Sequence, residues 1–442
     1  MKRIAGNSNK SKIGRNVIGL GIVSLFTDAA SEMIYPLVPL FITLLGSSVV
    51  ILGVIEGIAE TTAAMLKLIS GIISDRIGKR KLLVLIGYSI STIIRPFTGI
   101  VSAAWHIIFI RMLDRVGKGI RTAPRDALIA SSIDDSIRGK AYGFHRAMDH
   151  AGAVVGPLLA LITLSILIFG IRIHDALLIL RYTFLLAIIP GLLAVVALIL
   201  FVREKTDRGP VSEKIRFSIK QFDKNFIWYL GIVLLFTLGN SSDAFMLFRV
   251  QETINHSTWL YSQIMSIPFV SSAVGLFGSQ EMQKKLVDIF FIPLVWAFFH
   301  IIKVIFSTPF GALSDRIGRK SVINIGWGIY AFVYVAFAVL DKIPDNMQVA
   351  VTFVLFAIYA LYYAFSEGAE KAFVADVTAS DQRGRAFGLF NFTVGLGALP
   401  ASILFGVLYH AYGAAIAFGT GAGIACMAMV LLAVFVEEHS QI

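Results

Sequence analysis

Residues 71–81, GIISDRIGKRK, match residues 311–321, GALSDRIGRKS, in the first glycine, the run SDRIG and the basic pair that follows it. Two further pairs match in the same chain order: GIVSLFTDAAS (21–31) with GIVLLFTLGNS (231–241), and RGKAYGF (138–144) with RGRAFGL (383–389). Three matches in one order indicate a duplicated unit, the sequence signature of transporters built from parallel repeats.

The composition places this duplicated chain in a membrane. Of its 442 residues, 57% are hydrophobic and only 15% are charged, whereas soluble proteins carry about 25% charged residues. The net charge of +11 lies mostly in short segments between apolar runs, as in the cytoplasmic loops of membrane proteins. Since no basic soluble domain is present, we exclude nucleic acid as a partner.

The apolar runs are near twenty residues, the length that crosses a bilayer. They predict twelve helices in two sets of six: 17–43, 49–72, 82–100, 104–131, 140–169 and 177–202, then 226–252, 289–311, 320–340, 347–376, 385–409 and 412–436. An even number puts both termini on one side, and the basic N-terminal tail places that side in the cytoplasm. The predicted domains are a bundle at 1–202, a basic cytoplasmic linker at 203–225 and a second bundle at 226–442.

The second unit carries an insert. Residues 254–288 separate its first two helices, and they include an apolar stretch that resembles a thirteenth span. A crossing there would put SDRIGRK on the opposite side from its twin SDRIGKR. We therefore predict an outer-face segment that does not cross, either a lid or a decoration.

Several motifs resemble the major facilitator superfamily. They are the twin G-x-x-S-D-R-x-G segments, RVGKGIRTA (115–123) and GAVVGP (152–157), and the DRVGKGIRTAPRD and FHRAMDHAGAVVGP segments resemble a bacterial branch of it. The resemblance implies an all-α membrane fold of two pseudo-symmetric six-helix bundles. It also implies a secondary transporter of the bacterial inner membrane, without enzymatic activity or cofactor. Conformational roles would fall to Asp75, Arg76, Asp315, Arg316, Gly152, Gly156 and Pro157. For the glycines, close helix packing is the alternative to an antiporter-specific bend.

The stretch DRVGKGIRTAPRD (114–126) puts charge inside a predicted span. Its basic residues continue a stripe at spacings of 4, 3, 3 and 4: Arg111, Arg115, Lys118, Arg121 and Arg125. Each charge at mid-bilayer costs at least ~2.5–3.5 kcal/mol, so the stripe cannot face lipid. It must face either a solvated cavity or carboxylates on other helices.

Acidic and polar residues on other predicted spans could meet this stripe. They form either ion-pair networks that hold the helices together or a solute site between the two halves. For a solute site, we predict anion recognition by Arg115, Lys118, Arg121, Arg125, Asn240, Tyr363, Glu370 and Lys371. Proton coupling is predicted for Asp28, Glu32, Glu56, Asp149 and His150. Acids one turn apart repel, and histidine titrates near neutral pH.

The leading hypothesis is a monomeric, proton-coupled transporter of an anionic organic solute: a carboxylate metabolite, a carboxylate siderophore or an organophosphate. The alternative is a proton-coupled drug or cation exporter, favoured by the membrane acids. The sequence holds no P-loop and no supported nucleophilic triad, and its single cysteine, Cys426, forms no intramolecular disulfide. We expect neither an enzyme nor a metal protein; a site at His150 and His300 is the remaining metal alternative.

Overall fold

The computed structural model describes residues 14–77, 79–132, 138–204, 222–268, 271, 280–378 and 383–437. The first half contains α1 (Arg15–Glu32), η1 (Tyr35–Leu37), α2 (Val38–Leu44), α3 (Val49–Ile77), α4 (Arg80–Ile94), η2 (Arg95–Ile100), α5 (Ala104–Ser131), α6 (Arg138–Ser165), η4 (Ile166–Gly170), α7 (Ala176–Leu186) and α8 (Ile188–Phe201). The second half contains α9 (Lys224–Gly239), α10 (Ala244–His256), α11 (Thr258–Met265), α13 (Gln280–Ile317), α14 (Arg319–Ala338), η7 (Leu340–Lys342), α15 (Asp345–Asp376), α16 (Arg383–Tyr412) and α17 (Ala414–Phe435). Within the described ranges the regular elements are all helical, which confirms the predicted fold class.

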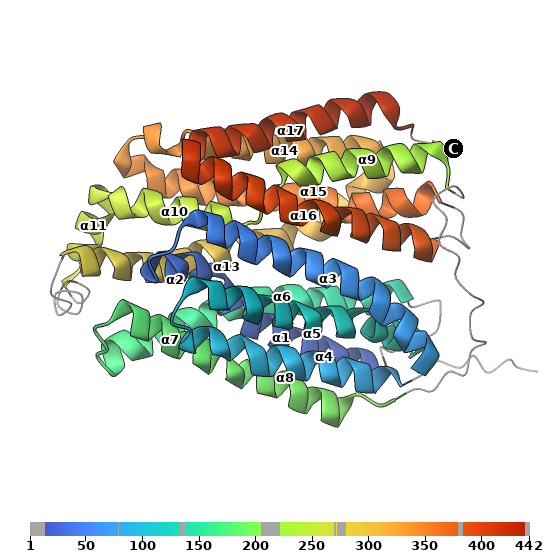
Figure 1. Ribbon diagram of the computed structural model, residues 1–442, viewed down its shortest axis with the longest axis horizontal. Helices are drawn as coiled ribbons and strands as arrows, with labels where there is room; N and C mark the ends of the chain where they lie inside the picture. Colours follow the sequence, from blue (N-terminus) through green and yellow to red (C-terminus); the bar gives the residue numbers. More distant parts are fainter. Residues whose placement is uncertain are drawn as a thin grey trace, which may run out of the picture.

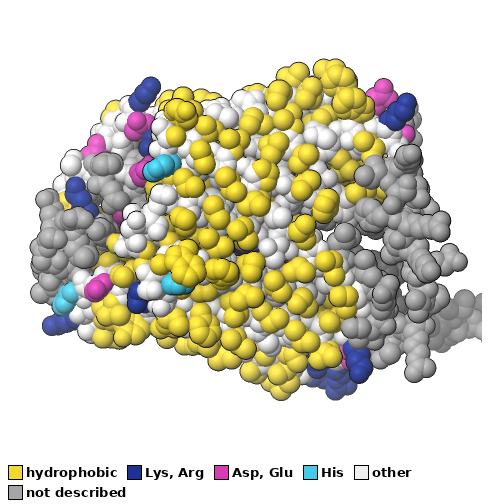
Figure 2. Space-filling view, viewed as in Figure 1, with side chains coloured by type: hydrophobic (Ala, Val, Ile, Leu, Met, Phe, Trp, Pro, Cys, Tyr) yellow, Lys and Arg dark blue, Asp and Glu magenta, His cyan; other side chains and the backbone are white. Residues whose placement is uncertain are grey.

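These helices form a multi-pass membrane protein. Eleven helical stretches in the described part of the chain are long and apolar enough to span a bilayer. The twelfth predicted span is α5, which has 28 residues but carries the charged stripe. Figure 2 shows hydrophobic side chains across the middle of one face and charged side chains toward its two ends. Such an apolar belt is what contact with lipid requires.

The helices of each half pack mainly on one another. In the first half, α1 contacts α6 and α8, and α5 contacts α3 and α4; in the second, α14 contacts α15 and α17. The halves meet where α3 packs on α16 and α6 packs on α13. In Figure 1, α2, α10 and α11 lie at one end, here called the far end. The chain's C-terminus lies at the other, the linker end.

Small residues bring the two halves together. A Cβ atom added at Gly53 of α3 would lie 2.3 Å from the carbonyl oxygen of Ser402 on α16, and one at Gly395 would lie 2.1 Å from the Cβ of Ala64. Thr61 donates a hydrogen bond of 2.7 Å to the Gly395 carbonyl oxygen. Close approach through small residues is how helices associate where lipid supplies no hydrophobic drive.

Two helices break partway across the bundle. The helix α1 ends at Glu32 and continues as η1 and α2, whereas α9 ends at Gly239 and α10 begins only at Ala244. Met33 and Ile34 occupy the first break, and residues 240–243 occupy the second. Irregular backbone is tolerated at membrane depth where it lines a cavity or is buried in protein. Both breaks therefore mark the interior of the molecule as the place to look for a site.

The region predicted as an insert contains the helix α11, whose eight residues are too few to cross a bilayer. The helix α13 begins at Gln280, inside the predicted insert, and runs for 38 residues. Residues 269–270 and 272–279 lie outside the described part of the chain, as does most of the predicted linker, 205–221. The domain boundaries stay predictions.

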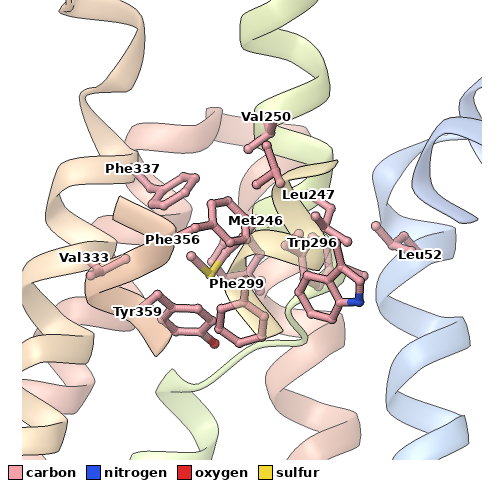
Figure 3. Close-up of a cluster of buried hydrophobic side chains, with 14 of the residues drawn as sticks. Leu52, Met246, Leu247, Val250, Trp296, Phe299, Val333, Phe337, Phe356 and Tyr359 are labelled. Atoms are coloured by element: carbon pink, nitrogen blue, oxygen red, sulfur yellow. The ribbon is translucent and has the colours of Figure 1, made fainter. Parts of the chain in front are cut away.

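A cluster of aromatic and aliphatic side chains forms the core of the second half near the far end (Figure 3). Phe299 stacks on Tyr359 with ring centroids 5.6 Å apart, and Phe337 meets Phe356 edge-on at 5.8 Å. Trp296 stacks on Phe299 at 4.9 Å. These contacts fix the sides of α13 and α15 that face the first half.

Candidate functional site

A cavity of about 560 Å³ lies between the halves, a size typical of small-molecule sites. Charged residues of both signs line it in equal number among the described residues. The acids are Asp28, Glu32, Glu56, Glu60, Asp114, Asp243 and Glu367, and the bases are Lys67, Arg95, Arg111, Arg115, Lys118, Arg121 and Lys303. The cavity is therefore formally neutral, although one of its walls carries the basic stripe.

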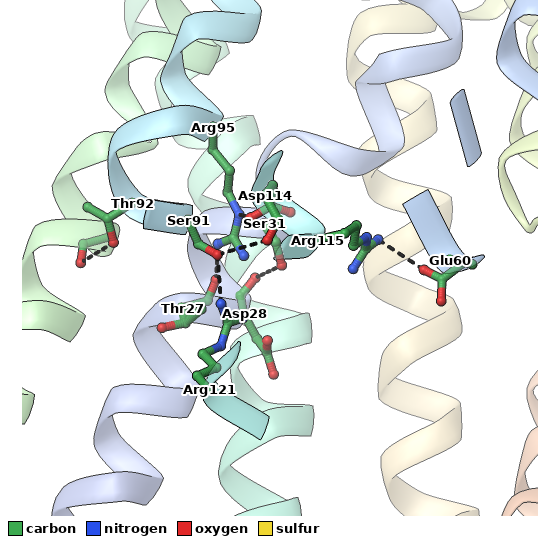
Figure 4. A network of polar contacts seen from close by, with 11 residues as sticks. Thr27, Asp28, Ser31, Glu60, Ser91, Thr92, Arg95, Asp114, Arg115 and Arg121 are labelled. Carbon is green, nitrogen blue, oxygen red and sulfur yellow. Dashed lines mark hydrogen bonds and ion pairs between the residues drawn. The ribbon is translucent and has the colours of Figure 1, made fainter. Parts of the chain in front are cut away.

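Ion pairs within the first half neutralise part of that stripe. The Nη2 atom of Arg111 lies 2.8 Å from Oε1 of Glu56, and both side chains are almost fully buried. Arg115 Nη2 lies 3.2 Å from Glu60 Oε1, the pair drawn in Figure 4. The carboxylates come from α3, which packs along α5. These arginines hold α3 and α5 in register.

The acid within the stripe, Asp114, is paired by the neighbouring helix. Arg95 Nε donates a 2.8 Å hydrogen bond to its Oδ1 atom, and Arg95 Nη1 donates to the Thr27 carbonyl oxygen at 2.9 Å. This network joins η2, α5 and α1 (Figure 4). Helical spacing alone allows Asp114 to pair with Arg111 or Lys118, but the structure pairs it with Arg95, because the packing of η2 on α5 brings that guanidinium to it.

Three cavity cations have no carboxylate within ion-pair distance in the described part of the chain. The Arg121 guanidinium donates to Ser91 Oγ at 2.6 Å and lies 4.5 Å from the centre of the Tyr88 ring. Lys118 and Lys67 line the cavity without a side-chain hydrogen bond or ion pair among the described residues. Their positive charge is available to a solute.

Three cavity acids have no lysine or arginine within ion-pair distance among the described residues. Asp28 and Glu32 lie one turn apart on α1, and Glu32 Oε2 accepts a 2.7 Å hydrogen bond from Trp296 Nε1. Asp243 is the last residue of the break after α9 and accepts hydrogen bonds from Tyr359 and Tyr363, at 2.5 Å and 2.9 Å. The cavity thus holds separated positive and negative groups.

Toward the far end, side chains from the two halves close the cavity. Ser242 lies 3.3 Å from the Tyr35 hydroxyl and donates to Glu56 Oε2, also at 3.3 Å. The Tyr35 ring tilts against Trp296, with centroids 5.3 Å apart. With the Trp296–Glu32 hydrogen bond, these contacts connect both broken helices to the opposite half.

Nearer the linker end, Glu367 of α15 is the meeting point. It forms an ion pair with Arg146 of α6, and its Oε2 atom lies 3.4 Å from Lys303 Nζ. Lys371 is 3.9 Å away on the same helix. One carboxylate from the second half therefore contacts cations of both halves.

The structure brings together eight of the thirteen residues predicted for solute binding and proton coupling. The cavity is lined by Arg115, Lys118, Arg121, Asn240, Tyr363, Asp28, Glu32 and Glu56. The others do not line it. Arg125 pairs with its neighbour Asp126 at 2.9 Å, and Glu370 accepts from Trp327 at 2.9 Å.

The remaining predicted residues lie beside the cavity on α6 and α15. Asp149 accepts a hydrogen bond from Ser24 and lies 3.6 Å from His145, which places it between α6 and α1. Lys371 is half exposed. His150 lies on α6 outside the lining.

The predicted conformational residues are placed only in part. The side chains of Asp75, Arg76, Asp315 and Arg316 lie outside the described residues. Gly152 and Gly156 pack against α1, where added Cβ atoms would lie 2.4 Å from the Leu25 carbonyl oxygen and 2.7 Å from that of Ala29. Pro157 lies within α6. The geometry shows close packing at both glycines.

Several cavity residues were not predicted to bind solute or to couple protons, and His300 was considered only as a metal ligand. Arg95 lies at the junction of α4 and η2, Trp296 and His300 lie on α13, and Tyr35 follows the break in α1. One signal was present: Trp296, His300 and Lys303 recur at spacings of four and three, and so share one face of a helix. Which way that face pointed could not be read without the packing of α13.

Comparisons with known proteins agree with this architecture. The family model described as Major Facilitator Superfamily matches residues 20–299 and 282–441. An uncharacterized MFS-type transporter of Methanocaldococcus jannaschii is 34% identical over 409 residues, which cover 91% of this chain and 90% of that protein. Part of the chain, 29%, is 28% identical to the multidrug resistance protein MdtH of Escherichia coli, of which the match covers 32%.

Solved structures show the same fold at low identity. A mutant form of the nucleoside transporter NupG gives a TM-score of 0.72 at 13% identity and covers 95% of this chain and 100% of that one. A D-xylose-proton symporter gives 0.68 at 15% identity, with 96% and 98% covered. These proteins are transporters and not enzymes. The chain belongs to the major facilitator superfamily and is a membrane transporter.

Proposed function

We propose that the protein is a secondary active transporter, coupled to protons, whose solute carries an anionic group. One observation carries the anionic part: Lys118 faces the cavity without a carboxylate partner among the described residues, although the arginines one turn or two turns before it are paired. A cation at membrane depth is costly unless a solvated cavity or a counter-charge stabilises it. A carboxylate or phosphate on the solute supplies that counter-charge.

Arg121 completes the anion site one turn further toward the linker end. Its Nη1 atom donates to Ser91, and its ring contact with Tyr88 fixes the guanidinium plane. Nη2 and Nε make no hydrogen bond to a described residue, so a planar fork of donors remains for carboxylate or phosphate oxygens. Lys67 lies in the same cavity on α3 and strengthens the positive field.

Proton coupling rests on Asp28 and Glu32. They lie one turn apart on α1 in the cavity lining, so their charges repel when both are ionised. Neither has a lysine or arginine within ion-pair distance among the described residues; there, Glu32 lies 3.9 Å from the His300 imidazole. A proton on one of them removes that repulsion and changes the charge that the solute meets.

Alternating access follows from contacts that join the halves. The Trp296–Glu32 and Ser242–Glu56 hydrogen bonds close the far side of the cavity. Protonation of Glu32 removes the charge from the first of these contacts, which shifts the balance between conformations open to either side. The linker end faces the cytoplasm of a bacterial inner membrane in this proposal, because the basic loops lie at that end. The unit is a monomer.

The test of the anion site is ligand-induced thermal stabilisation of the purified protein. Carboxylates and organophosphates are compared with lipophilic cations, on the native chain, Lys118→Ala, Arg121→Ala and the exposed control Lys342→Ala. A ligand at 100 times its dissociation constant adds about 2.7 kcal/mol. Stabilisation by anions that both cavity variants lose, and the control keeps, supports the proposal. Equal stabilisation of all four proteins by anions contradicts it.

Proton coupling is tested in proteoliposomes that contain a pH-sensitive dye. Solute added outside moves protons with the native protein. The Asp28→Asn variant should still bind solute, and proton movement should be lost in at least one of the Asp28→Asn and Glu32→Gln variants. Solute flux that is indifferent to both the pH gradient and the membrane potential would remove this part of the proposal.

A second candidate, proton-coupled export of organic cations, is favoured by a separate observation. Asp28 and Glu32 have no lysine or arginine partner among the described residues, and Trp296 and Tyr35 present aromatic rings beside Glu32. Aromatic faces with a nearby acid attract cations. The partial similarity to a multidrug resistance protein points the same way. Stabilisation by lipophilic cations alone, unaffected by Lys118→Ala, would decide for this candidate.

A further inference from the structure

The far part of the cavity contains a buried histidine whose ring nitrogens have no hydrogen-bond partner among the described residues. His300 of α13 lines the cavity and is 8% exposed. Neither its Nδ1 nor its Nε2 atom has a hydrogen bond to the described part of the chain. A buried polar group left unpaired is destabilising, because it has lost its hydrogen bonds to water without gaining others. An imidazole in this position is therefore poised to bond something that enters the cavity.

The Glu32 carboxylate, close to His300, indicates the chemistry of that partner. His300 Nε2 lies 3.9 Å from Oε2 of Glu32, too far for a direct hydrogen bond. Glu32 already accepts from Trp296 through Oε2, and its Oε1 atom has no hydrogen bond to a described residue. With its proton on Nδ1, the imidazole offers a lone pair at Nε2. The Glu32 carboxylate and Nε2 of His300 are then two hydrogen-bond acceptors on either side of one space. A group with several N–H donors fits such a space.

An ammonium group meets this requirement. It has three donors and no acceptor, so one nitrogen can bond both Glu32 and Nε2 of His300. The tilted rings of Tyr35 and Trp296 border the same region and add attraction for a cation. This subsite is the opposite in charge of the one around Lys118 and Arg121.

The two subsites are separated along the cavity. Tyr35 lies at the level of the Arg111 side chain along the cavity, since the Arg111 guanidinium is 5.4 Å from the centre of the Tyr35 ring. Lys118 follows Arg111 by seven residues on α5, which is roughly 10 Å along a helix axis. A solute that reaches both subsites needs several bonds between its charges.

We infer that the transported solute is a small zwitterion whose ammonium group binds between Glu32 and His300 and whose carboxylate or phosphate binds Lys118 and Arg121. An ω-amino carboxylate or a short peptide has the required separation of charges, and an α-amino acid does not. This inference rests on the proposed anion site and deepens it. It also accounts for the formal neutrality of the cavity lining, because a zwitterion leaves that balance unchanged.

The experiment measures dissociation constants by thermal stabilisation of the full chain in lipid nanodiscs. The probes are aminohexanoate and diglycine, with hexanoate and hexylamine as partners that each keep one charge. The zwitterions should bind at least about tenfold more tightly than either single-charge partner. Glycine should give no measurable shift.

The variants assign each charge to its subsite. Glu32→Gln and His300→Ala should bring aminohexanoate binding down to that of hexanoate, while hexanoate itself binds as before. Lys118→Ala should instead reduce aminohexanoate to the level of hexylamine. Lys342→Ala and Glu437→Gln, at exposed residues, are the matched controls and should change nothing.

Each contrary result has a distinct meaning. Hexanoate that binds as tightly as aminohexanoate, with both dependent on Lys118, overturns the ammonium subsite and leaves the anion site standing. Hexylamine that binds as tightly as aminohexanoate, with neither dependent on Lys118, overturns the anion site and the inference together. The absence of any shift with aminohexanoate and diglycine also overturns the inference, whatever other anions bind.

Discussion

The helices α5 and α15 hold related places in the two halves, yet they face the cavity with different chemistry. The helix α5 presents cations, two of which pair with acids of α3 inside its own half, and its acid Asp114 pairs with Arg95 of η2. The helix α15 presents Tyr359 and Tyr363, both bonded to Asp243. The charged side chains of α5, here called the charged wall, thus form their ion pairs within one half, whereas contacts across the cavity are few. That difference lets each half move as a unit while the contacts between halves open and close.

The largest expected effect on stability comes from removing one ion pair of the charged wall. Glu56→Gln leaves the Arg111 guanidinium buried without its carboxylate partner. We expect a loss of about 3 kcal/mol in unfolding free energy, measured by thermal or denaturant unfolding in detergent. The double variant Arg111→Met with Glu56→Leu should recover most of it, since neither side chain then carries a charge. A double variant no more stable than the single one would contradict the pairing.

Packing between α1 and α6 should be the next most sensitive. Gly156→Ala puts a Cβ atom 2.7 Å from the Ala29 carbonyl oxygen, and overpacking of this kind costs about 2 kcal/mol. The control is Gly423→Ala on α17, where nothing lies within 4 Å of the added atom. Melting temperatures of the two variants give the comparison. Equal values would mean that the close approach is absent.

The tyrosines that α15 presents to the cavity, here called the aromatic wall, should contribute less to stability. Removal of one of their hydroxyls should therefore cost less unfolding free energy. Tyr363→Phe deletes one hydrogen bond to Asp243 while Tyr359 keeps the other. We expect a loss of about 1.5 kcal/mol in the same unfolding assay. Tyr412→Phe, at a tyrosine that is 69% exposed, is the matched control. A loss of unfolding free energy as large as that of Glu56→Gln would contradict the difference proposed between the charged wall and the aromatic wall.

The smallest effect is expected at the last cation of the stripe. Arg125 pairs with a half-exposed Asp126 and does not line the cavity. Arg125→Ala should cost less than about 1 kcal/mol and leave solute affinity unchanged. A loss of affinity comparable to that of Lys118→Ala would extend the binding site along the whole stripe.

Much of this architecture was predictable from local patterns. Apolar runs gave twelve spans close to the observed helices, because span length is set by the bilayer and not by neighbouring helices. The stripe on α5 was predictable for the same reason, since helical spacing alone defines one face. Its partners were not: Arg95 reaches Asp114 through the packing of η2 on α5.

The same limit explains the missed residues of the second half. Asp243 lines the cavity because α9 ends at Gly239. The sequence contains no proline there that would have predicted the end of the helix. His300 is significant only because α13 turns it toward Glu32. Periodicity identifies which residues share a face, and only tertiary packing decides what that face meets.

The central claim is that the paired charges of α5 hold the structure and the unpaired ones hold the solute. The most direct measurement compares Asp114→Asn with Lys118→Ala, recording for each the melting temperature and the affinity for the best-binding anionic probe below that temperature. The account predicts that Asp114→Asn melts several degrees lower with affinity kept, and that Lys118→Ala melts as the native chain does with affinity reduced at least about tenfold. The reverse pattern, or the loss of both properties in both variants, would contradict it.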